Sequence, residues 1–297
     1  QRGLSRDARE NLQLYSILLP TAILIIVFMY APMFGLVIGF QNYVPGASFF
    51  GKDVEWVGLK HFIDFVNSYY FKRIMRNTVI LNLLNLVMGF WVPIVFALLL
   101  NEVRARGFKK FVQTASYLPY FISSVVVAGM VISFTGSDGI VSRLISALGG
   151  ETAAWITKAD AFPWIFTITR VWQSFGWSSI LYLSTISSID PGLYEAAEMD
   201  GANRFHKIWH VTIPHMLPLV IIQLILAIGS MLSVSSELIL LLYNPSTRST
   251  ADVIGTYVYR EGLLAGNFSS GTAAGLIVSL INLGLTVIAN AFCRKFT

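Results

Sequence analysis

Long apolar stretches alternate with short polar segments along this chain, and each apolar stretch has the length of a membrane span. A helix needs about 20 predominantly apolar residues to cross the hydrocarbon core of a bilayer. Six stretches reach that length, near residues 14–40, 77–100, 112–135, 163–187, 217–243 and 271–293. The pattern predicts an all-α integral membrane protein with about six transmembrane helices, in a single domain over residues 1–297.

Composition agrees with a multi-pass membrane chain. Charged residues make up 12% of the sequence and hydrophobic residues 55%, whereas a soluble domain carries about 25% charged residues. The single cysteine, Cys293, excludes an internal disulfide framework. The net charge of +5 is weak evidence for nucleic acid, because basic residues in membrane chains usually mark cytoplasmic loops. We therefore expect lipid, and no nucleic acid, around this chain.

The distribution of Lys and Arg predicts an orientation. With the N-terminus inside, the inner connections carry about twice the density of basic residues found in the outer ones. This bias places both termini and the segment 188–216 in the cytoplasm. Lys72, Arg73 and Arg76 oppose the bias, because they lie on the outer side. Their segment, FVNSYYFKRIMRN, interleaves apolar and basic residues and suggests an amphipathic helix on the outer surface.

The segment 188–216 is the longest polar run on the side predicted to be cytoplasmic and reads as two short helices. Asp190 is placed to cap the first, and Gly201 to end it with a positive φ. Asn203 is placed to cap the second, which we expect to stop at Pro214. The second helix has a mostly apolar stripe at helical spacing, made of Phe205, Ile208, Trp209 and Thr212.

Two charged residues fall inside predicted spans, Arg170 in 163–187 and Glu237 in 217–243. Charges in a span are costly, so they pair or face a polar path. One reading is a structural ion pair, or an arginine that reaches the interface. The other is a polar passage shared with Gln173, in which an indole ring stacks against a sugar. The two indoles considered for that role are those of Trp172 and Trp177. The sequence leaves both readings open.

The sequence contains no recognisable catalytic constellation. It has no phosphate-binding G-x-x-x-x-G-K-[ST] loop, no H-E-x-x-H and no G-x-S-x-G. His206 and His210 are spaced to share a metal on a helix, but nothing supplies a third ligand at matching spacing. We expect no enzyme activity, no metal and no cofactor in this chain.

The segment 188–216 carries a specific motif. Glu195-Ala196-Ala197 is followed after three residues by Gly201, and after nine more by Val211, Thr212, Ile213 and Pro214. This pattern resembles the signature of permease subunits of bacterial binding-protein-dependent ABC importers. The segments LPYFISSVVVAGMVISF and LLLYNPSTRSTADVIGTYVYREGL are similar to the polysaccharide and oligosaccharide permeases of the maltose-type branch. The large extra periplasmic domain of the maltose-type subunit is absent.

The resemblance implies a type I importer permease in the bacterial inner membrane, which translocates an oligosaccharide by ATP-driven alternating access. Two separate ATPase subunits would bind ATP and Mg, a second homologous permease would form a heterodimer, and an extracytoplasmic solute-binding protein would deliver the substrate. The resemblance implies that the segment 188–216, hereafter the coupling loop, couples the permease to the ATPases. The residues that would do so are Glu195, Ala196, Ala197, Asp200, Gly201, Phe205, Ile208 and Pro214.

An acidic oligosaccharide, such as an alginate or pectin fragment, is favoured by this resemblance and by Arg170 and the basic outer residues near Lys72. Three rival hypotheses remain at this point. An ABC permease for a non-sugar solute should lack the YNP…DVI…TYVYR segment. A secondary transporter should work without ATP and show an internal repeat, which is not visible. A membrane enzyme lacks the residues it would need.

Overall fold

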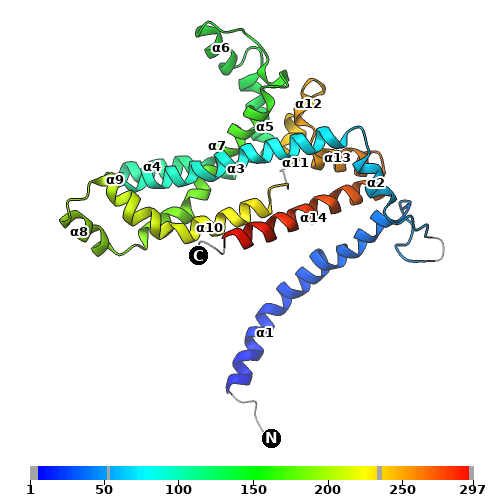
Figure 1. The fold of residues 1–297 in the computed structure, drawn as a ribbon, viewed down its shortest axis with the longest axis horizontal. Helices are drawn as coiled ribbons and strands as arrows, with labels where there is room; N and C mark the ends of the chain where they lie inside the picture. Colours follow the sequence, from blue (N-terminus) through cyan, green and yellow to red (C-terminus); the bar gives the residue numbers. More distant parts are fainter. Residues whose placement is uncertain (1–5, 52–53, 233–235, 294–297) are drawn as a thin grey trace.

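The computed structural model describes residues 6–51, 54–232 and 236–293, and within these ranges the chain is helical apart from its connections. An isolated pairing of Gln41 with Trp56 is the β-type contact found there. Four long helices run lengthwise through the body of the molecule (Figure 1). They are α3 (Phe71–Asn101), α7 (Phe162–Ser187), α10 (Ile213–Gly229) and α14 (Phe268–Cys293).

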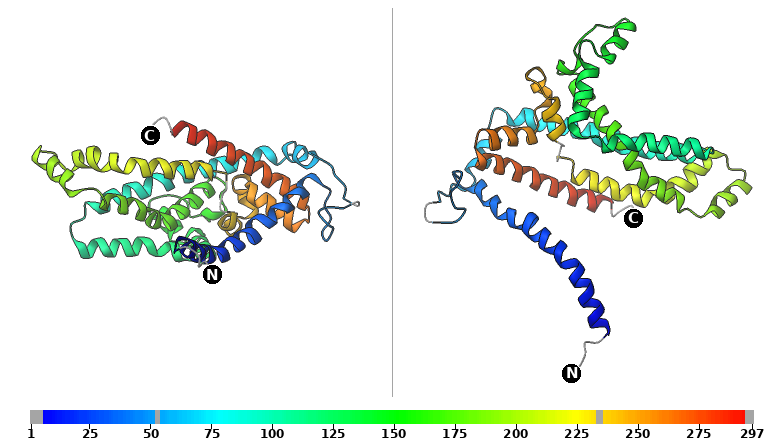
Figure 2. Two further views of the ribbon diagram at one scale, coloured as in Figure 1. Left: turned by 90° about the horizontal axis from the view of Figure 1, so that it is seen from below. Right: turned by 180° about the vertical axis from the view of Figure 1, so that it is seen from behind.

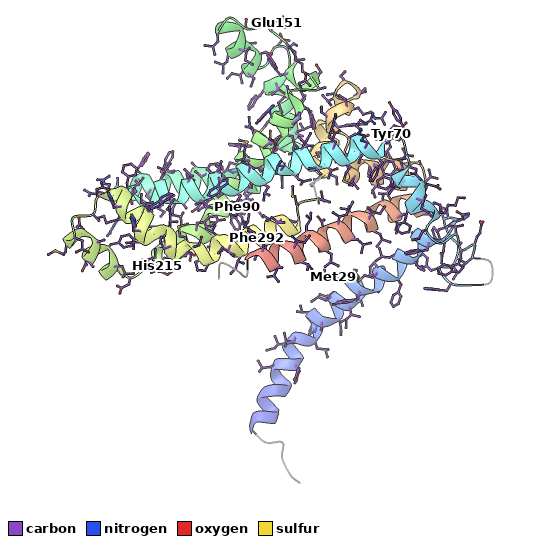
Figure 3. The ribbon with its side chains drawn as sticks, in the orientation of Figure 1. Met29, Tyr70, Phe90, Glu151, His215 and Phe292 are labelled. Atoms are coloured by element: carbon purple, nitrogen blue, oxygen red, sulfur yellow. The ribbon has the colours of Figure 1, made fainter. Side chains whose placement is uncertain are left out.

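Apolar clusters hold these helices together. Phe90, Ala97, Tyr182 and Met216 are buried in one cluster that joins α3, α7 and α10. Phe90 lies near the middle of the bundle (Figure 3). A second cluster joins α3 and α14 to α2 (Lys60–Val66) and α13 (Ile254–Tyr257). The bundle therefore has a core along its length, as side-chain packing between membrane helices requires.

Two arms leave the bundle (Figures 1 and 2). The first is α1 (Arg6–Ile25) with the π-helical turn Ile26–Tyr30, and every residue from Leu14 to Phe34 is exposed. The 3-10 segment Ala31–Phe40 connects this arm to the bundle and packs closely against α14. A Cβ at Gly39 would lie 3.4 Å from the Ala273 nitrogen. The second arm consists of α5 (Ser124–Thr135) and α6 (Ile140–Ala147).

The remaining described elements are short. They are α4 (Arg106–Tyr117), η3 (Leu118–Phe121), η4 (Trp155–Thr157), α8 (Pro191–Met199), α9 (Arg204–Lys207), η5 (Ile208–Thr212), α11 (Ser236–Leu242), η6 (Pro245–Thr247), α12 (Arg248–Ala251) and η7 (Val258–Leu264). The helices α8 and α9 lie together at one end of the bundle, and α2, α12 and α13 lie toward the other (Figure 1).

Five helical runs of the described chain are long and apolar enough to cross a membrane. They are Leu14–Phe40, Phe71–Asn101, Ser124–Ala147, Arg204–Gly229 and Phe268–Phe292. Helix α7 has 26 residues and covers the predicted span 163–187. It is not one of the five, because Arg170, Gln173 and its many hydroxyl residues lower its mean hydropathy.

Two predicted spans are not continuous helices. The stretch 112–135 passes from α4 through η3 to α5, because buried Pro119 has no N–H to donate and Ser123 caps the next helix. In the stretch 217–243, α10 ends at Gly229 and α11 begins at Ser236.

Helix α14 accounts for the end of α10. A Cβ at Gly229 would lie 2.6 Å from Thr286 Oγ1, so the two helices approach closely there. Just beyond, the Leu232 N–H donates to Asn282 Oδ1 at 3.0 Å instead of continuing the helical ladder. The side chain of a neighbouring helix thus satisfies the backbone where α10 stops.

A buried ion cluster ties the start of α3 to the α12–α13 segment. Asp252 is fully buried and accepts from Arg73 at 3.1 Å, from Arg260 at 3.0 Å and from the Thr256 hydroxyl at 2.8 Å. Asn77 donates to the Asp252 carbonyl at 3.0 Å. We call these five residues the Asp252 cluster. Burial lowers the pKa of Arg260, but the hydrogen bonds and charge of Asp252 outweigh it and raise that pKa overall.

The Asp252 cluster corrects the prediction of a surface helix at FVNSYYFKRIMRN. Phe71 begins α3 itself, and Ile74 is completely buried. Arg73 is bound to Asp252, and Arg76 donates to the Ser249 carbonyl at 3.3 Å. Two of the three basic residues that opposed the charge bias therefore have partners in a neighbouring segment, while Lys72 is exposed.

Candidate functional site: a polar cavity and an exposed helical loop

A cavity of about 670 Å³ lies between α3, α7 and α10. We call it the Arg170 cavity, because the Arg170 guanidinium is the charged group among the residues that line it. Amide and hydroxyl side chains make up most of its remaining polar lining: Asn82, Asn85, Ser174, Ser178, Gln223 and Ser230. A cavity with one cation and many neutral hydrogen-bonding groups suits a polar ligand with negative charge.

Helical spacing builds the α7 wall of the cavity. Arg170, Ser174 and Trp177 follow one another at i, i+4 and i+7, so they lie along one face. On α3, Asn82 and Asn85 donate to the carbonyls four residues earlier, at 2.6 Å and 2.8 Å. Each amide keeps its Oδ1 to accept a hydrogen bond, for example from a hydroxyl of a ligand.

The five pathway residues expected from the sequence separate into two groups. Arg170 and Trp177 line the cavity, whereas Trp172, Gln173 and Glu237 are not among its lining residues. Gln173 is buried on α7, where its amide donates to the Ile122 carbonyl at 3.0 Å. Because each helical residue turns the direction by about 100°, Trp172 points to the opposite side of α7 from Arg170. Gln173 lies only about 60° from Arg170 around the helix, and it is its hydrogen bond to Ile122 that directs it toward the α4–α5 break.

Arg170 and Glu237 are not in direct contact, although the Glu237 charge acts on the Arg170 guanidinium. Glu237 lies in the first turn of α11 and is exposed. Among the ion pairs of the described residues, none joins Arg170 to Glu237. The sequence analysis also missed Asn82, Asn85 and Gln223. A detectable signal was present, because Asn82 and Asn85 are polar residues at i, i+3 within an otherwise apolar span.

The coupling loop has the caps that its sequence predicts. Asp190 Oδ1 accepts from the Gly192 N–H at 3.0 Å at the start of α8. Gly201 has a φ of 77° directly after that helix. Asn203 Oδ1 accepts from the His206 N–H at 3.0 Å and starts α9. These local interactions fix the loop as two helices joined by a tight turn.

The predicted end of the second helix at Pro214 is wrong. Helix α9 continues through η5 into α10, giving one helical run from Arg204 to Gly229. Pro214 lies at the start of α10, directly after the π-helical turn. The wider turn places the Ile213 N–H on the Ile208 carbonyl, so the backbone accommodates a proline without ending the helix.

Two side-chain contacts hold the coupling loop to itself. The Tyr194 hydroxyl lies 2.9 Å from Thr212 Oγ1, which links α8 to η5. The Lys207 ammonium lies 3.7 Å from the Glu198 carboxylate, and Glu198 is largely exposed. The loop is thus folded, although few of its side chains are buried.

Its outer surface includes large apolar side chains. Met199, Phe205 and Trp209 are 89%, 82% and 69% exposed. Glu195, Ala196 and Asp200 are exposed beside them, while Ala197 and Ile208 are partly covered. Large exposed apolar side chains gathered in one place indicate a protein-binding surface. His206 and His210 stack at 5.9 Å, and the described residues hold no group of three metal-ligating side chains.

Comparison with known proteins identifies the family. Residues 89–297 match the family described as "Binding-protein-dependent transport system inner membrane component". The chain belongs to this family. It is a multi-pass permease subunit of the bacterial inner membrane, of the ABC importer type.

Relatives of this permease extend over nearly its whole length. The polygalacturonan/rhamnogalacturonan transport system permease protein YteP of Bacillus subtilis is 42% identical, with 95% of this chain and 88% of the relative covered. Protein LplB of the same organism is 39% identical, with 99% and 93% covered.

Solved structures agree with the fold. A chain of a bacterial ABC transporter that imports the acidic polysaccharide alginate has a TM-score of 0.89 and 39% identity, with 98% of both chains covered. The same TM-score is found for the bacterial alginate transporter in complex with a periplasmic protein that holds an alginate pentasaccharide. The permease therefore has the architecture of an ABC importer membrane subunit.

Proposed function

We propose that this permease is one of two homologous membrane subunits of an ATP-driven importer for acidic oligosaccharides. An extracytoplasmic binding protein delivers the sugar, and the Arg170 cavity receives it during alternating access. Two ATPase subunits, which bind ATP and Mg, grip the coupling loop from the cytoplasm. The sugar then passes into the cytoplasm when ATP-driven closure of the ATPases changes the access of the cavity.

The lining of the Arg170 cavity is the observation that carries this proposal. Its charged group is a guanidinium, which matches a carboxylate in two parallel hydrogen bonds. The surrounding amides and hydroxyls match sugar hydroxyls, and Trp177 supplies an aromatic surface. The relatives support the same class of substrate, because one is named for polygalacturonan and one solved structure for alginate, both chains of sugar carboxylates.

The features of the coupling loop support the proposal that separate subunits bind ATP and dock on this permease. The chain contains no phosphate-binding loop of its own. Phe205 and Trp209 offer apolar anchors for an ATPase groove, and Glu195 offers a carboxylate to a basic residue of that groove. Ala196 leaves room for close approach, and Gly201 keeps the turn that orients α8 against α9.

Uptake by the complete complex in proteoliposomes tests the proposal. We expect ATP-dependent uptake of penta-galacturonate and little uptake of neutral maltopentaose. Arg170→Gln should lower penta-galacturonate uptake about tenfold, because one charge-assisted hydrogen-bonding partner is lost. The same variant should leave maltopentaose uptake unchanged. Equal stimulation of ATPase activity by both sugars would contradict the preference for acidic oligosaccharides. Uptake without ATP would contradict the proposal that import is driven by ATP.

A further inference from the structure

An aromatic stack covers the Trp177 ring at the edge of the Arg170 cavity. The Tyr120 ring lies parallel to it, with ring centroids 4.7 Å apart and an interplanar angle of 6°. Phe121 meets the same indole edge-on at 5.4 Å. Trp177 lines the cavity, whereas Tyr120 does not, and both rings remain close to half exposed. One face of the cavity's indole is therefore taken by a residue from outside the cavity wall.

The backbone that carries Tyr120 is held in place. Tyr120 lies in η3, between α4 and α5. Before it, α4 packs so closely on α7 that a Cβ at Gly176 would overlap the Ser116 carbonyl. After it, the Ile122 carbonyl accepts from Gln173 of α7 at 3.0 Å. With both flanks fixed to α7, the Tyr120 ring leaves the stack only by turning about its side-chain torsions, which also breaks its edge contact with Phe121 at 5.6 Å.

The α7 face beside the stack has the order of groups that a uronate chain requires. Arg170 and Trp177 are seven residues apart, about 10 Å along the helix, which is close to the length of a disaccharide. Ser174 lies between them on the same face. A carboxylate at Arg170 thus places the ring about two sugar units further along the chain beside Trp177, with a hydroxyl donor and acceptor in between.

We propose that the face of Trp177 now covered by Tyr120 is a stacking subsite for a pyranose ring, on which an incoming oligosaccharide replaces the Tyr120 ring. This inference rests on the proposed function. The apolar C–H face of a pyranose packs against an indole as the Tyr120 ring does, and the sugar's polar rim meets the cavity hydroxyls. Sugar and tyrosine compete for one surface, so Tyr120 weakens sugar binding by the strength of its own stack, about threefold to tenfold.

Calorimetric titration tests this competition. The complete complex of both permeases and the ATPases, in nanodiscs without binding protein, is titrated with penta-galacturonate. Tyr120→Ala should lower the Kd about threefold, because the competitor is removed. Trp177→Leu should raise it about tenfold, because the surface itself is lost. In the double variant, Tyr120→Ala should change nothing further, since no surface is left to compete for.

Two matched variants keep the result interpretable. Tyr120→Phe retains the stack and should keep the wild-type Kd, and Trp177→Phe retains an aromatic surface if Trp177→Leu fails to assemble. A Tyr120→Ala complex that binds more weakly than wild type overturns the subsite, because Tyr120 would then be part of the binding wall. Absence of binding by wild type overturns the proposed function as well. Wild-type binding with unaltered affinity in Trp177→Leu overturns the subsite alone.

Discussion

The two ends of this permease place their carboxylates in opposite environments. In the Asp252 cluster, a fully buried carboxylate is held by two arginines and a threonine hydroxyl. In the coupling loop, Glu195 is exposed, and the neighbouring Phe205 is 82% exposed. A buried and saturated charge fixes a segment in place, whereas an exposed carboxylate beside apolar side chains is available to another protein. The Asp252 cluster therefore stabilises its own end of the permease, whereas the coupling loop presents side chains that another protein can contact.

The largest expected effect comes from removing the centre of the Asp252 cluster. Asp252→Ala leaves Arg73 and Arg260 without their shared carboxylate in a partly buried site. Breaking a buried pair in this way costs about 3–5 kcal/mol. Thermal unfolding of the purified subunit in detergent should show a strongly lowered midpoint. The matched control is Glu261→Gln. Among the ion pairs of the described residues, the more exposed Glu261 carboxylate pairs with Arg260, so this substitution should cost less than about 1 kcal/mol.

An unchanged thermal unfolding midpoint in Asp252→Ala would contradict this contrast between the two ends, because the Asp252 cluster would then contribute nothing to the stability of the fold.

A functional effect without a stability effect is expected at the coupling loop. Glu195→Gln removes a charge that has no partner among the ion pairs of the described residues. Loss of one charged contact with the ATPase should lower ATP-driven uptake about tenfold, equivalent to about 1.4 kcal/mol. Uptake in proteoliposomes and thermal unfolding of the same preparation measure the two quantities separately.

Glu198→Gln is the control for this variant. It lies on the same helix, but its carboxylate is directed to Lys207 at 3.7 Å. Uptake should therefore stay near the wild-type rate. Equal losses in both variants would mean that general charge on α8, rather than Glu195, governs coupling.

The smallest expected effect concerns the contact that links α8 to η5 within the coupling loop. Tyr194→Phe removes the hydroxyl that lies 2.9 Å from Thr212 while keeping the ring. One hydrogen bond contributes about 1 kcal/mol, so amide exchange of α8 should become a few-fold faster while the bundle is unaffected. Exchange that accelerates throughout α10 as well would show that the loop and the bundle unfold as one unit.

Local signals in the sequence predicted local structure well. The caps of the coupling loop follow from Asp190, Gly201 and Asn203, because each acts on backbone groups within a few residues. The motif around Glu195 predicted the family, and the family match confirms it. The roles of the individual loop residues stay predictions.

Features that depend on distant partners were not predictable from the sequence alone. The end of α10 depends on Asn282 and Thr286 of α14, which lie more than fifty residues further along the chain. The role of Arg73 depends on Asp252, 179 residues away. Gln173 was placed in the pathway because it is polar, but its partner is the carbonyl at the α4–α5 break. Polarity within a span indicates that a partner exists and leaves its identity open.

The uninterrupted helix through Pro214 has a mechanical consequence. The run Arg204–Gly229 has 26 residues and is about 39 Å long. It begins beside the exposed surface of the coupling loop and carries Gln223 and Ala227 of the cavity wall near its far end. A rod of this length converts a tilt of about 10° into a displacement of about 7 Å at its tip. If a partner ATPase tilts the near end of this rod, as the proposed coupling requires, the cavity wall near the far end moves with it.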